Sequence, residues 1–263
     1  MAYSIYIPTK GRADIITTSK LLDTENISYK LVIEPQDVKS YKEFFTDEKL
    51  VILPKNNVGV SGVRTFIKSY SQELGEEYHW QIDDNIKGFK RRIGNKNVEW
   101  SGRENIEEIE KYVDEHENIG QAGMIHHMFA WGRNKDYNYN QQVVSCVLFN
   151  NKIKSNWREG VIDDTDFSLQ VLSEGFTTIV FNRLVMNKSA IKTMKGGCTD
   201  LYYNDDNVRH NRQKRLQDLW PGWFDIHIVN GTSRVKPSRI WRTFKQRPVK
   251  KNSIKHKKFF NIV

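Results

Sequence analysis

Two adjacent acidic residues at the end of an apolar segment are the first chemically informative feature of this 263-residue sequence. The segment 78–82 (YHWQI) has the apolar content of a buried strand, and Asp83, Asp84 and Asn85 follow it at once. Neighbouring carboxylates at a buried strand end repel each other, so they need a cation or hydrogen-bond donors nearby. Their oxygens suit Mg²⁺ or Mn²⁺, ions that often also carry phosphates. The alternative is a turn, where Asp and Asn bond to the local backbone.

Polar residues also follow three other predicted strands, at residues 4–8, 29–33 and 50–53. They are Thr9, Gly11 and Arg12 after the first strand, Glu34 after the second, and Gly59 and Arg64 in the turn and helix after the third. Open α/β sheets bind ligands outside the carboxyl ends of their strands, so these positions predict one shared site. The turn at Gly59 offers backbone N–H groups to a phosphate but matches neither the dinucleotide-binding fingerprint nor a P-loop. Arg64 could reach the base or the diphosphate, but taken alone it fits an exposed surface position better.

A second acidic cluster, Asp163-Asp164-Thr165-Asp166, opens a predicted helix over residues 163–175. Acidic residues in a first turn stabilise a helix through its macrodipole, and one of them is enough to cap it. Three acids within four residues exceed that need. Their spacing therefore also favours general-base catalysis, in which a carboxylate removes the proton of an acceptor hydroxyl.

The segment 188–197 contains three lysines and a pair of glycines. Such a loop can close over a diphosphate and stabilise the leaving group, and Lys195 is the residue we expect to do so; the alternative is an exposed connection. Among the histidines, His126 and His127 lie in an apolar run, so at least one of them is expected to pack. His210 and His227 come late enough to supply a metal ligand from the C-terminal part, although no spacing selects one of them.

The rest of the chain alternates strand-like and amphipathic segments, the pattern of a layered α/β domain. Further strands are expected at residues 122–130, 142–149 and 177–181, and further helices at residues 14–23, 38–45 and 205–219. The pattern weakens after Met186. We therefore divide the chain into a domain at 1–200, which holds the candidate site, and a basic, helical or irregular region at 201–263.

Composition narrows the class of protein. The chain is 38% hydrophobic, has no apolar run of about 18 residues and begins without the pattern of a signal peptide, so we expect a cytoplasmic protein without a membrane span. Cys146 and Cys198 provide no disulfide framework. The net charge of +9 is uneven, because residues 209–258 hold 15 basic and two acidic residues. This basic region indicates a polyanionic partner, or else a solvated tail that aids solubility.

The order of these motifs resembles that of GT-A-fold glycosyltransferases. More narrowly, residues 3–200 resemble the TET/JBP-associated glycosyltransferases, which include the base J glucosyltransferase and phage DNA-base glycosyltransferases. The resemblance implies a GT-A-like, Rossmann-type mixed central sheet flanked by helices, with a basic C-terminal extension. It also implies a UDP-sugar donor and a bound Mn²⁺ or Mg²⁺.

The resemblance assigns roles to the motif residues. Thr9, Arg12 and Glu34 would hold the nucleoside, Asp83 the ribose, and Asp84 the metal ion, with Asp83 and Asn85 as further candidate ligands. The family often has Asp at the third position, so Asn85 is a departure from its pattern. The base would be Asp164, with Asp163 beside it.

The acceptor implied by the resemblance is the hydroxymethyl group of a 5-hydroxymethylpyrimidine, with 5-hydroxymethylcytosine as the first expectation, in double-stranded phage DNA within a host cytoplasm. The basic region would then contact DNA phosphates. The residues expected to do so are Arg209, Arg212, Lys214, Arg215, Arg239, Arg242 and Lys245. The candidates for base stacking are Trp220, Trp223, Trp241, Tyr202 and Tyr203, although core packing is favoured for these aromatic residues. A protein or glycan acceptor, or a non-catalytic DNA-binding protein on a transferase scaffold, are the alternatives.

Overall fold

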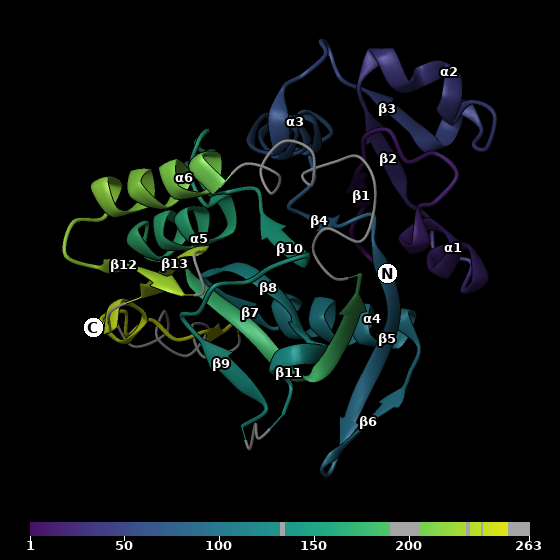
Figure 1. Ribbon diagram of the computed structural model, residues 1–263. Coiled ribbons are helices and arrows are strands. Elements are labelled where there is room, and N and C mark those ends of the chain that lie inside the picture. The colour runs from purple at the N-terminus through teal and green to yellow at the C-terminus, as the bar shows by residue number, and fades with distance from the viewer. Residues whose placement is uncertain (132–134, 190–205, 230–231, 238, 252–263) are drawn as a thin grey trace, which may run out of the picture.

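The computed structural model describes the chain except for residues 132–134, 190–205, 230–231, 238 and 252–263. Its centre is a ten-stranded mixed sheet in which nine strands follow the order β3-β2-β1-β4-β10-β8-β11-β5-β6, with β9 paired to β11 (Figure 1). The strands are β1 (Ile5–Pro8), β2 (Lys30–Ile33), β3 (Leu50–Ile52), β4 (Tyr78–Ile82), β5 (Ile86–Ile93), β6 (Lys96–Glu99), β8 (Ile119–His126), β9 (Tyr137–Tyr139), β10 (Cys146–Asn150) and β11 (Thr177–Lys188).

Strand directions bring the polar strand ends together. β1, β2, β3 and β4 are mutually parallel where they pair, β10 is antiparallel to both β4 and β8, and β11 is parallel to β8. The carboxyl ends of β1, β2, β4, β8 and β11 therefore lie at the same edge of the sheet. That edge is where an open α/β sheet binds its ligands.

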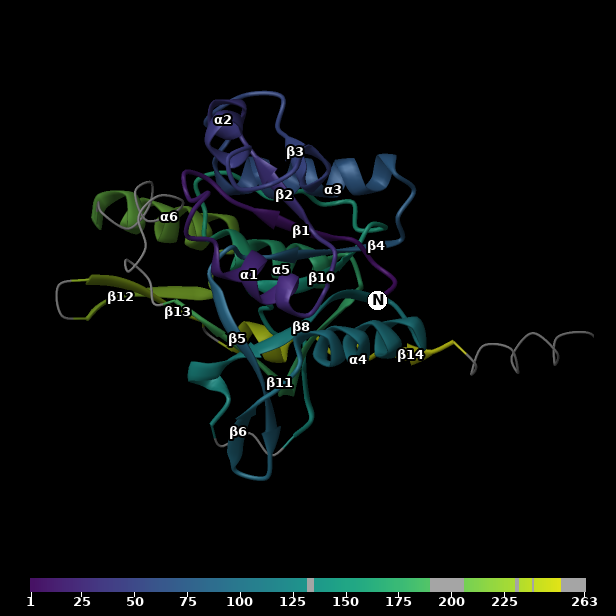
Figure 2. The same ribbon diagram turned by 90° about the vertical axis from the view of Figure 1, so that its right-hand side faces the viewer.

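Helices cover both faces of the sheet (Figure 2). They are α1 (Thr17–Thr24), α2 (Val38–Tyr41), α3 (Gly59–Glu73), α4 (Gly102–Asp114), α5 (Asp163–Ser173) and α6 (Asp206–Leu219). Alternate residues of β1 face opposite sides: Ile5 and Ile7 pack in one cluster with α4, whereas Tyr6 packs with Ile67 of α3. On the same face as α3, Phe167 of α5 packs against Phe149 of β10. The α/β class expected from the sequence, a mixed sheet with helices on both faces, is confirmed.

Several predicted boundaries were wrong. The helix expected at 14–23 begins at Thr17, the strand expected at 177–181 continues to Lys188, and the strand expected at 122–130 ends at His126, where a 3-10 helix η3 (His127–Phe129) follows. Two features were not predicted, namely the β5–β6 hairpin and strand β9. β5 and β9 each pair with the distant strand β11, and β6 pairs with β5. The alternation of polar and apolar residues within these strands is weak, so the sequence alone shows little sign of them.

The C-terminal region is more regular than expected. The predicted helix is confirmed as α6, and it is followed by a hairpin of β12 (Phe224–Val229) and β13 (Thr232–Pro237) and by a 3-10 helix η5 (Arg239–Arg242). β14 (Val249–Lys250) pairs with β7 (His116–Glu117). The region shares an apolar cluster with α5, formed by Val161, Leu169, Leu216, Phe224 and Ile240. The proposed boundary near 200 falls within residues 190–205, outside the described part of the chain.

Trp220, Trp223 and Trp241 pack against that cluster, as the core interpretation expected, while Tyr202 and Tyr203 lie outside the described residues. Within the described residues, no helix is both long enough and apolar enough to cross a membrane.

Candidate active site

Asp83 stands at the centre of a charged cluster at the carboxyl edge of the sheet. One of its carboxylate oxygens is 3.1 Å from the guanidinium of Arg64 on α3, and the other is 2.7 Å from the ammonium of Lys188 at the end of β11. Although burial raises the pKa of Asp83, the two cations outweigh it and lower the pKa to about 2. Lys188 also donates to the hydroxyl of Ser145 at 2.8 Å. Asp83 is therefore an ionised carboxylate held between two cations.

Asp84 makes a different set of contacts. Its oxygens accept hydrogen bonds from the Arg12 guanidinium at 2.8 Å and from the Thr9 hydroxyl at 2.9 Å. The Thr9 hydroxyl also lies 2.8 Å from the phenol oxygen of Tyr41. Burial raises the pKa of Asp84 despite the charge of Arg12. The first-strand motif and the acid pair, 72 residues apart for Arg12 and Asp84, thus form one buried network.

Glu34 organises the neighbouring turns. Lys10 lies 2.8 Å from its carboxylate, and the backbone N–H of Val58 donates to it at 3.3 Å. Burial raises the pKa of Glu34, but these donors outweigh the effect of burial and lower the pKa below its usual value, so the group is ionised. Gly11 and Gly59 have φ values of +62° and +69°, a backbone region that favours glycine, and so permit the two turns to reach this edge. The four strand-end motifs expected to form one site are brought together.

The second acidic cluster faces the first across Arg64. The Arg64 side chain lies 3.5 Å from a carboxylate oxygen of Asp163 and 3.8 Å from one of Asp164. Asp163 is also paired at 3.0 Å with Arg212 of α6. Burial, followed by the negative charge of Asp163, raises the pKa of Asp164 to about 7, while Arg64 lowers it less. Two neighbouring carboxyls thus differ: one is bound by cations, and the other has a pKa suited to proton transfer near neutral pH.

Asp166, the third acid of this cluster, has a structural role. It is fully buried, is bound by the Arg158 side chain, and accepts a hydrogen bond from the Trp220 indole at 2.8 Å. The cluster therefore divides into one buried anchor, Asp166, and two acids that reach the charged edge.

The acid pair offers an incomplete set of ligands for a divalent ion. Within the described residues, no group of three His, Cys, Asp or Glu side chains is placed to hold a metal. Asp83 is the more open carboxylate, with 21% of its side chain exposed against 8% for Asp84, and the buried Oδ1 of Asn85 has no hydrogen-bond partner among the described residues. Mg²⁺ is usually held by one or two carboxylates together with substrate phosphates, and this donor set fits that mode.

The residues expected to contact DNA differ in their exposure to solvent. Lys214, Arg215, Arg242 and Lys245 are exposed, and Arg209 is half-buried. Arg212 differs from the expectation, because it is only 13% exposed and binds Asp163 and the carbonyl of Val161 inside the site. Lys195 and the side chain of Arg239 lie outside the described part of the structure.

Sequence reasoning assigned one residue of the site to the wrong element and missed two others. Lys188 was placed in a loop, but it ends β11 beside Asp83; Ser145 and Tyr41 were not considered. The position of Lys188 at the end of an apolar run was the one sequence feature that could have indicated its place at a strand end. No sequence pattern distinguishes Ser145 or Tyr41 from other serines and tyrosines of the chain. The pairing of β4 with β10 brings Ser145 to the edge of the sheet, and the packing of α2 brings Tyr41 there.

No curated protein sequence matches the chain. Among solved structures, A197 from STIV shares 11% identity with a TM-score of 0.44, covering 72% of this chain and 86% of its own. A putative nucleotide-diphospho-sugar transferase from Desulfovibrio desulfuricans G20 shares 10% identity with a TM-score of 0.42, covering 83% of this chain and 96% of its own. The sequence profile of the TET-associated glycosyltransferases matches residues 3–197, which hold both acidic clusters, and the chain belongs to that family.

Proposed function

We propose that this glycosyltransferase moves a sugar from a UDP-sugar to the hydroxymethyl group of a 5-hydroxymethylpyrimidine in DNA. The observation that carries the proposal is the convergence of both acidic clusters on Arg64, which lies beside Asp83 and Asp164. One cluster can hold a nucleotide diphosphate through cations, and the other presents a carboxyl with a pKa near 7. These are the two requirements of direct sugar transfer to a hydroxyl group.

In the reaction, Asp164 in its ionised form accepts the proton of the acceptor hydroxyl. The hydroxyl oxygen forms a bond to the anomeric carbon as the bond from that carbon to the diphosphate oxygen breaks, and UDP leaves with the electron pair. Arg64 and Lys188 are placed to stabilise the negative charge that develops on the diphosphate. Thr9, Arg12 and Glu34 would bind the nucleoside.

Mn²⁺ or Mg²⁺ would be held by Asp83 and Asp84 and would add positive charge at the leaving diphosphate. Binding at Asp84 requires Arg12 to exchange its present partner, since the two form a buried pair at 2.8 Å. A phosphate of the donor is an anion that Arg12 can take instead. Chelation with EDTA, followed by restoration with Mn²⁺, tests this part of the proposal through the rate of UDP release.

The test of the whole proposal is mass spectrometry of nucleosides. Hydroxymethylated duplex DNA is incubated with the protein, Mn²⁺ and a panel of UDP-sugars, and the expected result is a hydroxymethylpyrimidine nucleoside heavier by one sugar residue. UDP release with protein or glycan acceptors but unmodified DNA would instead support the other transferase function. Salt-dependent DNA binding without any UDP release would support a non-catalytic DNA-binding protein.

A further inference from the structure

A short segment at the active-site edge exposes three large apolar side chains. Met128, Phe129 and Trp131 are 70%, 60% and 60% exposed, although they follow directly on the buried strand β8. β8 ends at this edge beside β11, with His126 paired to Met186, two residues before Lys188. Adjacent apolar side chains in water on a folded protein mark interaction surfaces rather than core.

The backbone that carries these side chains is anchored. Ala130 is fully buried, and its carbonyl accepts a hydrogen bond from the Arg92 guanidinium on β5. The ring of His126 accepts a hydrogen bond from the N–H of Met128 at 3.1 Å and packs against the ring of Phe129. We call residues 128–131 the apolar projection. Its three large side chains, Met128, Phe129 and Trp131, are exposed on an anchored backbone, so their exposure is a property of the fold.

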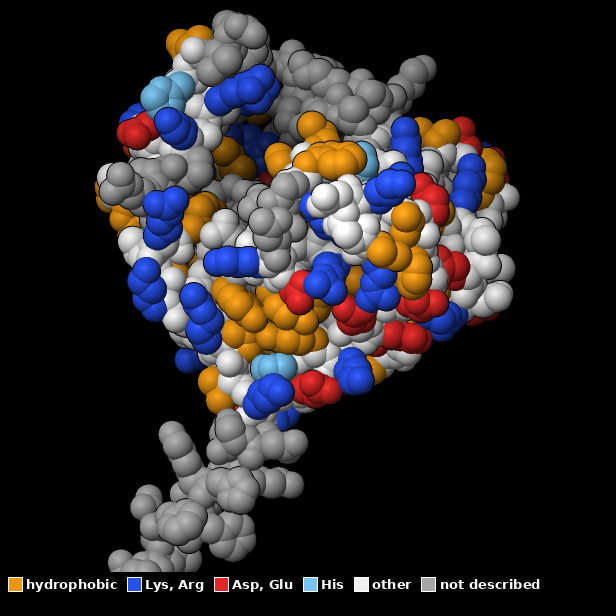
Figure 3. All heavy atoms as spheres, turned by 90° about the horizontal axis from the view of Figure 1, so that it is seen from below, with side chains coloured by type: hydrophobic (Ala, Val, Ile, Leu, Met, Phe, Trp, Pro, Cys, Tyr) orange, Lys and Arg blue, Asp and Glu red, His pale blue; other side chains and the backbone are white. Residues whose placement is uncertain are grey.

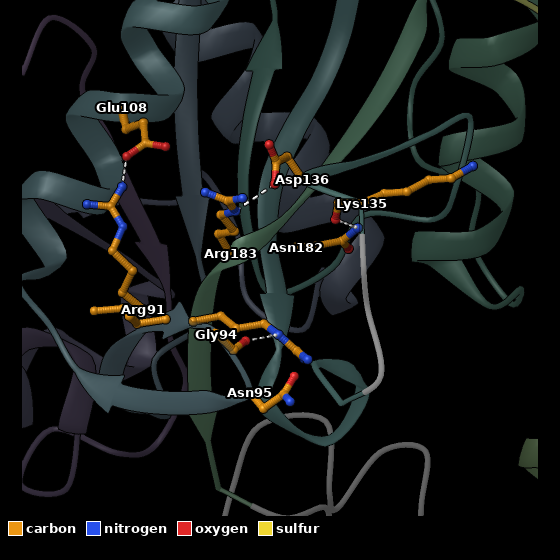
Figure 4. Close-up of a pocket in the computed structure, with 10 residues that line it drawn as sticks. Arg91, Gly94, Asn95, Glu108, Lys135, Asp136, Asn182 and Arg183 are labelled. Atoms are coloured by element: carbon orange, nitrogen blue, oxygen red, sulfur yellow. Dashed lines mark hydrogen bonds and ion pairs between the residues drawn. The ribbon is translucent and has the colours of Figure 1, made fainter.

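A basic cavity lies beside the projection. Its volume is about 490 Å³, and it lies between the end of β5, β11 and the start of β9 (Figure 4). In Figure 4, Arg91 is turned to Glu108 and Arg183 to Asp136, each joined by an ion pair. Arg92 instead donates to two backbone carbonyls, which do not neutralise its charge. The cavity lining includes four basic side chains and two acidic ones, a net positive charge.

The charge extends along the hairpin that forms this wall. Residues 86–99 contain five basic residues and one acidic residue. Figure 3, which views the molecule from this side, shows hydrophobic side chains gathered next to Lys and Arg side chains. Figure 1 places this hairpin well apart from α6 and the β12–β13 hairpin, which belong to the basic C-terminal region. The protein thus has a second basic surface, and this one is joined to exposed rings.

We propose that the apolar projection and the basic cavity dock the acceptor duplex. The rings of Phe129 and Trp131 contact bases of the DNA, and Arg92 holds a backbone phosphate at the cavity. Apolar rings beside the Arg92 guanidinium, which is bound to carbonyls alone, match the two kinds of surface that a nucleic acid offers, the apolar parts of its bases and its phosphates. This inference rests on the proposed DNA acceptor and names the surface that presents that acceptor to Asp164.

Binding of a dye-labelled duplex, measured by fluorescence anisotropy without donor sugar, tests the docking surface. Trp131→Ala and Phe129→Ala should each weaken binding by about tenfold, whereas Trp131→Phe, which keeps a stacking ring, should restore most of it. Arg92→Gln should lower the slope of log affinity against log salt by about one. Phe44→Ala, at a side chain 57% exposed on another face, and Lys152→Gln, 71% exposed at the opposite edge of the sheet, are the matched controls and should bind as the parent does.

Hydrolysis of the UDP-sugar without acceptor should be unchanged in the Trp131 and Phe129 variants, because both leave the contacts of Asp83 with Arg64 and Lys188 in place. The docking surface is refuted if the parent protein glycosylates DNA and the variants Trp131→Ala, Phe129→Ala and Arg92→Gln all bind the duplex with the parent's affinity. That result leaves the proposed function intact. A parent protein that neither binds nor glycosylates hydroxymethylated duplexes would overturn both.

Discussion

Neutralising Asp164 is the most direct test of the catalytic arrangement. The Asp164→Asn variant keeps the size of the side chain but cannot accept a proton at neutral pH. General-base catalysis contributes about 10²–10⁴-fold to a rate, so kcat should fall by that factor. The KM for the donor should change little, because Asp83, Arg64 and Lys188 keep their mutual contacts at 2.7–3.1 Å.

The dependence of kcat/KM on pH is a second, independent test of Asp164 as the base. With a pKa of about 7, the ionised fraction of Asp164 rises from about one-tenth at pH 6 to about nine-tenths at pH 8, so kcat/KM of the parent should rise about tenfold over that range. The profile of Asp164→Asn should lose this rise. In Asp163→Asn, the rise should move to lower pH, because the charge of Asp163 is one of the causes that raise the pKa of Asp164.

The assay is the initial rate of UDP release with hydroxymethylated duplex, corrected for release without acceptor, between pH 5.5 and 8.5 (a range chosen to span about one and a half units on either side of 7). Asp218→Asn is a matched control, since that carboxylate is 61% exposed on α6 and paired with Lys214. An Asp164→Asn enzyme with more than about one-tenth of the parent rate, or with the parent pH profile, would show that another group accepts the proton.

Three further predictions concern the scaffold. Arg12→Ala removes the cation from a buried carboxylate and should lower the free energy of unfolding by about 3 kcal/mol in urea denaturation, and an unchanged midpoint would contradict a structural role for this pair. Gly123→Ala places a Cβ 2.5 Å from the carbonyl oxygen of Cys146 and should cost about 2 kcal/mol or more, whereas Gly88→Ala, with 3.6 Å of space, should cost less. Burial lowers the pKa of His79 to about 3, below its unfolded value of about 6.5, so the unfolded state binds the proton first on acidification. Stability should therefore fall by about 1.4 kcal/mol per pH unit below about 6.5 from this group, a loss that His79→Gln should remove from the pH dependence of thermal unfolding.

Much of the candidate site was predictable because its signals are local. The sequence places acids directly after an apolar strand, a Gly-containing turn before a helix, and a cluster of acids at a helix start, and each of these depends only on neighbouring residues. The carboxyl ends of parallel strands share an edge, so the convergence of Thr9, Arg12, Glu34 and Asp84 could be expected from the alternation of strands and helices alone. The structure places these residues as that expectation required.

Other parts of the site depended on contacts between distant segments. Arg212 looked like one of several exposed basic residues of a charged helix, but α6 packs on α5 through Leu216 and brings this side chain to Asp163. No local pattern distinguishes it from Lys214, two residues on. The raised pKa of Asp164 likewise arises first from burial, which tertiary packing alone fixes.

The sequence by itself determined the class of fold, the order of the strand-end motifs and the uneven distribution of charge, because these follow from residue type and spacing. The tertiary structure decided which cation meets which carboxylate, which tryptophans are core, and which apolar side chains remain exposed. Lys188 shows the reason most clearly. A register shift in β11 and its pairing with both β5 and β8 bring this residue to the end of a strand 2.7 Å from Asp83, and pairings across such distances leave no mark in local periodicity.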